Sequence, residues 1–289
     1  MVAYHQPKTL DHALQLIRRT PRMTIIAGGT DVYPAKATRA GWGTMQHPDV
    51  LDISRIRFHR GVETNATSWS ISPLTTWTDI IRADLPPLFD GLKAAAREVG
   101  GVQIQNRGTL IGNICTASPA ADGVPPLLTL DAEVEIESHE GTRTVPLASF
   151  IDGYRHTALA PNEMVIGLRI PRQAGDGHRH GHFRKLGARR YLVISIAMVA
   201  GVFDYNEVGV IKSARVAVGA CSAVAMRLMA LERDLVGQRP SGSLPQPGHL
   251  ADLTPLDDIR ASADYRRAAA LQLVRDMLED AAIDQRSAA

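Results

Sequence analysis

The chain has 289 residues and a net charge of +2 at pH 7, a length that favours two domains and a charge too balanced for a nucleic-acid partner. Two cysteines, Cys115 and Cys221, are too few for a disulfide framework, an iron–sulfur cluster or a Cys-rich zinc site. The N-terminus lacks an apolar signal segment, and no apolar run reaches about 18 residues. We therefore expect a cytoplasmic protein without membrane insertion.

The first half of the chain alternates between short helices and short strands. A helix capped by Thr9 is expected from hydrophobic periodicity, and Thr76 with Asp79 forms a capping-box pattern that opens another. The expected helices lie at 9–19, at 32–41, from Thr76 onward and at 90–99. The expected strands lie at 22–27, 50–54, 69–73 and 132–138.

The second half begins after a polar, Gly-rich stretch at 172–182, which is the best candidate for a domain boundary. Beyond it, the runs at 192–203 and 214–221 are apolar and, in part, typical of strands. Helices are expected at 224–237 and 263–282. Strands and helices mix in both halves, which predicts an α+β architecture.

A strand runs directly into a glycine-rich turn formed by Ala27, Gly28, Gly29, Thr30 and Asp31. Glycines let the backbone adopt positive φ and let a ligand approach closely, and successive N–H groups in such a turn bind anions. The alternative is an ordinary strand-to-helix turn.

A second polar loop spans 105–123 and offers further donors at Gly108, Thr109, Gly112 and Asn113. Ser118 precedes a proline that forces an extended turn, and the Asp122 carboxylate could accept hydrogen bonds from hydroxyls. Two donor-rich loops with an aspartate fit the pyrophosphate and polyol of a dinucleotide, whereas the alternative is a structural Asx turn at each site. No GxGxxG or Walker sequence is present, which argues against a Rossmann or P-loop site.

Three histidines alternate in the polar stretch, at His178, His180 and His182. A solvated linker is favoured over a metal site, since no other ligand type lies nearby in sequence. A basic cluster follows at Lys185, Arg189 and Arg190, either as a solvated strand end or as cations against an electron-rich ligand. No nucleophile or general-base arrangement is recognisable, so no catalytic residue and no metal ligand are assigned.

These motifs, in this order and spacing, resemble the medium, FAD-binding subunit of the molybdenum hydroxylases, the family of xanthine dehydrogenase and carbon monoxide dehydrogenase. The sequences AGGTD at 27–31 and QIQNRGTLIGN…ASPAAD at 103–122 resemble the two FAD loops of that family. Phe183-Arg184-Lys185 followed by Arg189-Arg190 resembles the entry to its C-terminal domain. DIRASADYRR at 258–267 resembles the signature before its final helix.

The resemblance implies a vanillyl-alcohol-oxidase-like (PCMH-type) FAD-binding domain at 1–175, with subdomains at about 1–55 and 56–175. A smaller C-terminal α+β domain of the carbon monoxide dehydrogenase flavoprotein type would occupy 180–286. The implied function is electron transfer through FAD, from [2Fe–2S] clusters on a small subunit to an external acceptor. The substrate would be oxidised on a large molybdopterin subunit, and the whole would be a dimer of heterotrimers.

The resemblance also implies a role for each matching residue. The turns at 28–31 and 109–113 would hold the FAD pyrophosphate, and Asp122 would accept from ribityl or ribose hydroxyls. Val165 would pack near the isoalloxazine, and Lys185 would lie beside the ring. The implied FAD-binding set is Ala27, Gly28, Gly29, Thr30, Asp31, Thr109, Ile111, Gly112, Asn113, Ser118, Asp122, Val165 and Lys185.

The chain departs from the family pattern at several positions, among them Gln105, which stands where the family often has arginine. Ile111 stands where the family usually has glycine, and a β-branched residue at positive φ would be an outlier. The aromatic residue that animal xanthine dehydrogenases place near the flavin is replaced by Val99, which leaves the acceptor open. The alternatives are a free-standing flavin oxidase of related fold acting on a small substrate and a non-catalytic small-molecule-binding protein.

Overall fold

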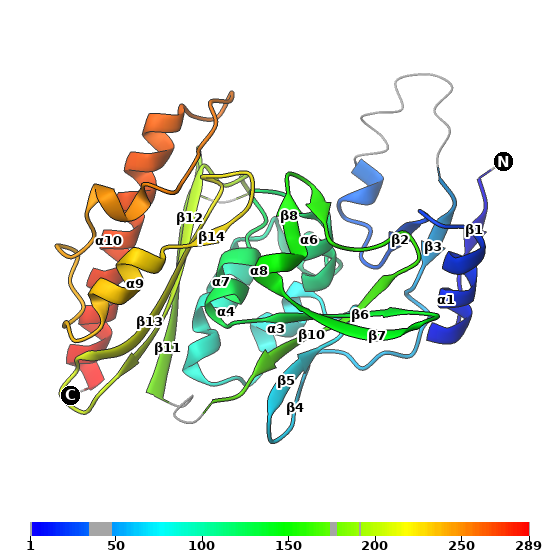
Figure 1. Ribbon diagram of the computed structural model, residues 1–289, viewed down its shortest axis with the longest axis horizontal. Helices are drawn as coiled ribbons and strands as arrows, with labels where there is room; N and C mark the ends of the chain where they lie inside the picture. Colours follow the sequence, from blue (N-terminus) through cyan, green and yellow to red (C-terminus); the bar gives the residue numbers. More distant parts are fainter. Residues whose placement is uncertain (1, 35–47, 174–177, 191, 289) are drawn as a thin grey trace.

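The computed structural model describes residues 2–34, 48–173, 178–190 and 192–288. Figure 1 shows three layers of helix and sheet along the long axis, with the N-terminal elements at one end and the C-terminal helix at the other. The α+β architecture is confirmed. Most of the helix expected at 32–41 lies outside the described residues.

The N-terminal layer is a small parallel sheet covered by one helix. Its strands are ordered β1-β3-β2, with bounds Tyr4–His5, Val50–Asp52 and Thr24–Ile26. Helix α1 (Leu10–Arg19) begins at the predicted cap, where the Thr9 side chain accepts a hydrogen bond from the His12 N–H. The buried face of α1 packs with the residues that follow β3 in one hydrophobic cluster.

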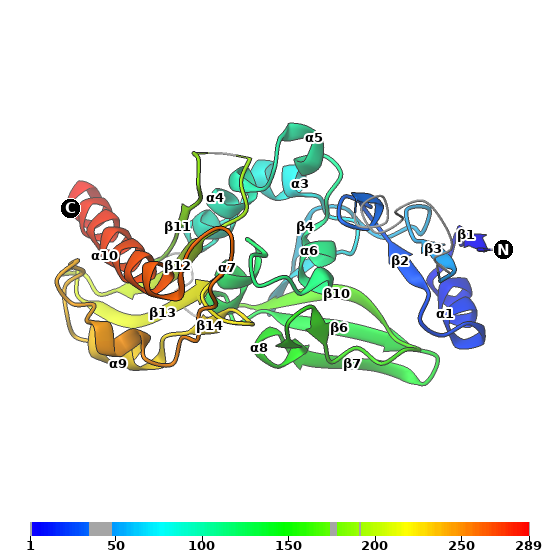
Figure 2. The ribbon, with the colours of Figure 1, turned by 90° about the horizontal axis from the view of Figure 1, so that it is seen from above.

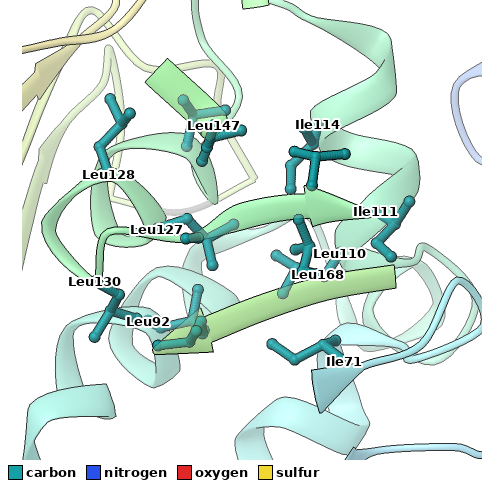
Figure 3. Close-up of a cluster of buried hydrophobic side chains, with 14 of the residues drawn as sticks. Ile71, Leu92, Leu110, Ile111, Ile114, Leu127, Leu128, Leu130, Leu147 and Leu168 are labelled. Atoms are coloured by element: carbon teal, nitrogen blue, oxygen red, sulfur yellow. The ribbon is translucent and has the colours of Figure 1, made fainter. Parts of the chain in front are cut away.

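The central layer is a five-stranded antiparallel sheet in the order β4-β5-β10-β6-β7. The strand bounds, in that order, are Val62–Thr64, Ser68–Ile71, Met164–Pro171, Glu133–Ser138 and Gly141–Pro146. The helices whose buried residues share its core are α3 (Trp77–Arg82), α4 (Asp90–Glu98), α6 (Leu110–Thr116), α7 (Val124–Thr129) and α8 (Leu147–Phe150), while the short helix α5 (Val102–Gln105) buries no residue and contacts α3. Figure 3 shows their leucines and isoleucines meeting Ile71 and Leu168 from the strands.

The predicted capping box at the start of α3 is confirmed, because Thr76 and Asp79 each bond the other's backbone N–H. Short elements complete this half of the chain: a two-stranded sheet of β8 (Ile151–Gly153) and β9 (His156–Thr157), and the 3-10 turn η1 (Pro87–Phe89).

The C-terminal layer is a four-stranded antiparallel sheet in the order β11-β12-β13-β14. The strand bounds are Arg179–Leu186, Ala197–Tyr205, Ile211–Gly219 and Met226–Arg227. Helices α9 (Met229–Leu235) and α10 (Ala263–Ala288), joined by η3 (Pro247–Leu250), pack on the sheet, while α4 and α7 of the central layer contact the same strands (Figure 2).

Two sequence predictions in this layer were wrong, and a third was right only for part of its range. His180 and His182 lie in β11 rather than in a solvated linker, because every residue of 179–186 pairs with β12. The run at 192–203, expected to be partly strand, forms β12 from Ala197 onward. The helix expected at 224–237 begins only at Met229, since Met226 and Arg227 pair with β13.

The central and C-terminal layers meet through a close backbone contact. A Cβ added at Gly181 of β11 would lie 2.4 Å from the Leu88 carbonyl oxygen, and one at Gly91 of α4 would lie 2.7 Å from the His182 carbonyl oxygen. Beside this contact, Asp131 accepts from Arg215 at 2.7 Å and from Arg227 at 2.9 Å across the layers. The layers therefore form one packed body.

Candidate functional site

A cavity of about 750 Å³ lies where the two predicted loops meet the central sheet. Its volume is within the range of small-molecule and cofactor sites. Twelve of the thirteen residues assigned from the sequence line it, all except Lys185. These residues lie between Ala27 and Val165 in the sequence, and the fold brings them together around one cavity.

Glycine at position 28 is what lets the two loops touch. A Cβ there would lie 2.0 Å from the Arg107 carbonyl oxygen, a distance that backbone atoms cannot tolerate. Gly29 has φ +73°, a conformation that glycine adopts without a steric penalty. The loops therefore depend on these glycines for their mutual position.

The first loop presents its backbone donors to the cavity. Within the described part of the chain, the N–H groups of Gly28, Gly29, Thr30 and Asp31 donate to no protein acceptor. The Asp31 carboxylate is tied instead to Thr116, whose hydroxyl donates at 3.4 Å, and lies 3.7 Å from the Arg155 guanidinium. Successive unpartnered N–H groups form a concave site for an anion.

Helix α6 supplies the donors of the second loop. Thr109 caps the helix by accepting from the Gly112 N–H at 3.0 Å, and the Leu110 N–H donates to the Thr75 carbonyl at 3.1 Å. The Ile111 N–H has no acceptor among the described residues, as expected for the first turn of a helix.

Ile111 avoids the backbone conflict that its side chain would create at positive φ. It lies in the first turn of α6 and is absent from the residues with left-handed backbone. Its side chain is 4% exposed and packs into the core of the central layer (Figure 3). The substitution of the family glycine is therefore accommodated by helical backbone.

Asp122 forms part of the cavity wall and is joined to the C-terminal layer. Its carboxylate accepts from the Lys185 ammonium at 2.8 Å and from the Ser195 hydroxyl at 2.7 Å. Burial raises the pKa of the Asp122 carboxyl, and the Lys185 charge and the two hydrogen bonds oppose that rise. A carboxylate has about four lone-pair sites, so capacity remains for a ligand hydroxyl.

Lys185 lies behind this wall rather than in the cavity lining. Its side chain is only 4% exposed, and its ammonium also donates to the Glu98 carbonyl at 3.4 Å. Lys185 can therefore influence a bound ligand through Asp122 and through its own field.

Several cavity residues were missed by the sequence reasoning. Arg155 lies on the β8–β9 turn with φ 50°, and the segment 192–194 closes the cavity from the C-terminal layer. Trp77 and Cys115 also line it. The left-handed turn at Arg155 has no glycine to signal it, and 192–194 was absorbed into an expected strand.

Within the described ranges, no group of three or more His, Cys, Asp or Glu side chains could hold a metal ion. None of the helices that the structure describes is both long and apolar enough to cross a membrane.

Comparison with known families matches the chain in two parts. Residues 1–173 match the model of the FAD binding domain in molybdopterin dehydrogenase. The chain belongs to this family. Residues 182–281 match the C-terminal domain of carbon monoxide dehydrogenase flavoproteins.

Relatives with names support the same family. The nicotinate dehydrogenase FAD-subunit of Eubacterium barkeri is 34% identical over 245 residues, covering 81% of this chain and 79% of the relative. The carbon monoxide dehydrogenase medium chain of Hydrogenophaga pseudoflava is 27% identical over 289 residues, with 96% of each chain covered. A solved chain of that organism's carbon monoxide dehydrogenase superposes with a TM-score of 0.86 at 28% identity, covering 97% of this chain and 96% of that one.

The residues of this molybdopterin dehydrogenase flavoprotein fit FAD, the cofactor of the family. Gly28, Gly29, Thr30, Asp31 and Ile111 line one cavity from two loops, and among the described residues their backbone N–H groups have no acceptor, which leaves them available to a pyrophosphate. The rest of the lining is largely apolar, with Val99, Leu159, Met164 and Val165 available to a flat ring.

Proposed function

We propose that the chain is the flavin-bearing electron-transfer subunit of a molybdopterin-dependent dehydrogenase or hydroxylase complex. It takes electrons from the [2Fe–2S] clusters of a small partner subunit and passes them to an external acceptor. The observation that carries the proposal is the single cavity that joins the two family loops and holds twelve of the thirteen assigned residues.

We further propose the role of each residue group. The turns at 28–31 and 109–113 hold the pyrophosphate, Asp122 accepts from a cofactor hydroxyl, and Val165 packs near the ring. FAD supplies the exchange between one-electron carriers and a two-electron acceptor when it is bound. Lys185 offsets the negative charge of Asp122 in the cavity wall, so that carboxylate does not oppose negative charge on the reduced ring, and the reduction potential is higher than it would be beside an unpaired carboxylate.

The proposed assembly includes a large molybdopterin subunit, the small iron–sulfur subunit and this chain, as a dimer of heterotrimers. The named relatives include an FAD-subunit and a medium chain of dehydrogenases, which supports such an assembly. Two domains, at 1–175 and 180–286, follow the two family matches closely. Both cysteines are free, which supports a reducing, cytoplasmic location.

Anaerobic reduction of the bound flavin tests the function. The isolated, FAD-loaded chain should stay yellow with candidate organic substrates, because the carboxylates that line the cavity are already engaged, Asp31 by Thr116 and Arg155 and Asp122 by Lys185 and Ser195. The co-expressed complex should bleach with its substrate. Rapid bleaching of the isolated chain by an alcohol, amine or aldehyde would instead establish a free-standing flavin oxidase.

A further inference from the structure

A second pocket of about 380 Å³ lies directly behind the wall of the FAD cavity. Val193 lines both spaces, and the Lys185–Asp122 pair joins them, with Asp122 on the cavity side and Lys185 on the pocket side. Gly187 packs closely against this wall, because a Cβ there would lie 2.3 Å from the Val193 side chain. The two spaces therefore share a wall at Val193 and at the Lys185–Asp122 pair.

The charge of the second pocket is positive. Lys185, Arg189 and Arg190 line it, against the single carboxylate of Glu98. Because Asp122 already neutralises Lys185, the excess charge comes from the two arginines. Both arginines are exposed to solvent at the pocket mouth.

The two arginines differ in the hydrogen bonds that they make within the protein. Arg189 donates to the Leu192 carbonyl, from Nε at 3.1 Å and again from a terminal nitrogen, and so holds the segment that closes the FAD cavity. Arg190 has no hydrogen bond or ion pair to any other described residue. Its planar guanidinium is therefore available for bidentate binding of a carboxylate or phosphate.

We propose that this second pocket binds the anionic group, phosphate or carboxylate, of the molecule that receives electrons from the cofactor. This rests on the proposed function, and it narrows the acceptor to an anionic, water-soluble compound rather than a neutral quinone. Like charges gathered in one concavity repel one another, and an anion between them removes that repulsion. Val193 lines both spaces, so an acceptor bound in the second pocket would lie beside the FAD cavity.

Calorimetric titration of the FAD-loaded full chain tests the proposal. Inorganic phosphate, malonate and NAD⁺ would be titrated separately at constant ionic strength, and flavin absorbance would be followed in parallel. At least one of them should bind saturably. The anion that binds most tightly identifies the chemical class of the acceptor. NAD⁺ would indicate a dinucleotide, malonate a carboxylate compound, and phosphate a small phosphorylated compound.

Three variants make the test specific. Arg190→Ala should weaken binding roughly two- to fivefold, the range for exposed ion pairs, and Glu98→Gln should strengthen it by a similar factor. Arg97→Ala is the matched control, because Arg97 is an exposed arginine on α4 outside the pocket lining, and binding should not change.

Absence of saturable binding by all three anions would overturn the proposal, as would an Arg97→Ala effect equal to that of Arg190→Ala. Flavin absorbance separates this failure from failure of the proposed function. A chain that retains FAD but binds no anion loses only the acceptor site, whereas a chain that never holds FAD contradicts the function itself.

Discussion

Asp122 and Lys185 form a buried ion pair whose two partners come from different layers. The carboxylate side chain is 11% exposed and the ammonium side chain 4%. Taking both charges out of water is costly, so the pair is stable only while each partner compensates the other. The Ser195 hydroxyl adds a further bond to the carboxylate.

Replacing Asp122 by Asn should therefore lower the free energy of unfolding by about 3–5 kcal/mol, because Lys185 remains buried without its counter-charge. Urea unfolding with and without FAD would measure this loss. Asp84→Asn is the control, since Asp84 is exposed and should change stability by less than about 0.5 kcal/mol. If the free energy of unfolding falls no more in Asp122→Asn than in Asp84→Asn, water hydrates the Lys185 ammonium in place of the lost carboxylate.

Residue types with a strong local signature were the ones that the sequence could locate. The glycines of the two loops predict a turn, and their hydroxyl side chains predict hydrogen-bonding groups, from the local sequence alone. Residues that act through distant partners were not found in this way. Lys185 contacts Asp122 across 63 positions, and only the family resemblance had pointed to its importance.

At the scale of single elements, β11 shows how tertiary pairing overrides composition. Its sequence, RHGHFRKL, is polar enough to suggest a linker. Arg184 is satisfied by Asp280 of α10 at 2.6 Å, and the His182 imidazole lies 3.9 Å from Asp284. By contrast, α1 and α3 were predictable because their capping side chains lie within three residues of the groups they bond.

Gly181→Ala should disrupt the packing of β11 on α4 and η1. The new methyl group would lie 2.4 Å from the Leu88 carbonyl and 2.9 Å from the Gly91 nitrogen, so backbone must move. We expect a loss of about 1–3 kcal/mol, as in other overpacked interfaces, measured by chemical unfolding. Gly248→Ala is the matched control, because its Cβ would meet nothing within 4 Å. Equal stability of the two variants would contradict this account of the contact.

At the scale of the whole molecule, the FAD cavity spans the layers. The central layer provides α6, β10 and the second loop, while the segment 192–194 comes from the C-terminal half. The sequence predicted a domain boundary in the polar stretch at 172–182, but it could not predict this shared wall, because the wall arises only from packing.

Thermal unfolding should consequently show a single transition for the whole chain, and FAD should raise the midpoint temperature of that transition. At a free FAD concentration of about 100 times Kd, binding adds about 2.7 kcal/mol to the stability of the folded state. Scanning calorimetry of the chain with and without FAD would measure this. Two separate transitions, of which FAD shifts only one, would show that the halves unfold independently.

Residues 192–194 are synthesised after both donor loops, so the order of synthesis also sets the order in which the walls of the cavity can form. A ribosome has made both donor loops long before it makes the segment that closes the cavity. Domains generally fold as they emerge, N-terminal first, so the early loops wait in an open form. We therefore expect tight retention of the cofactor only after residues 192–194 have been made and have docked on the cavity.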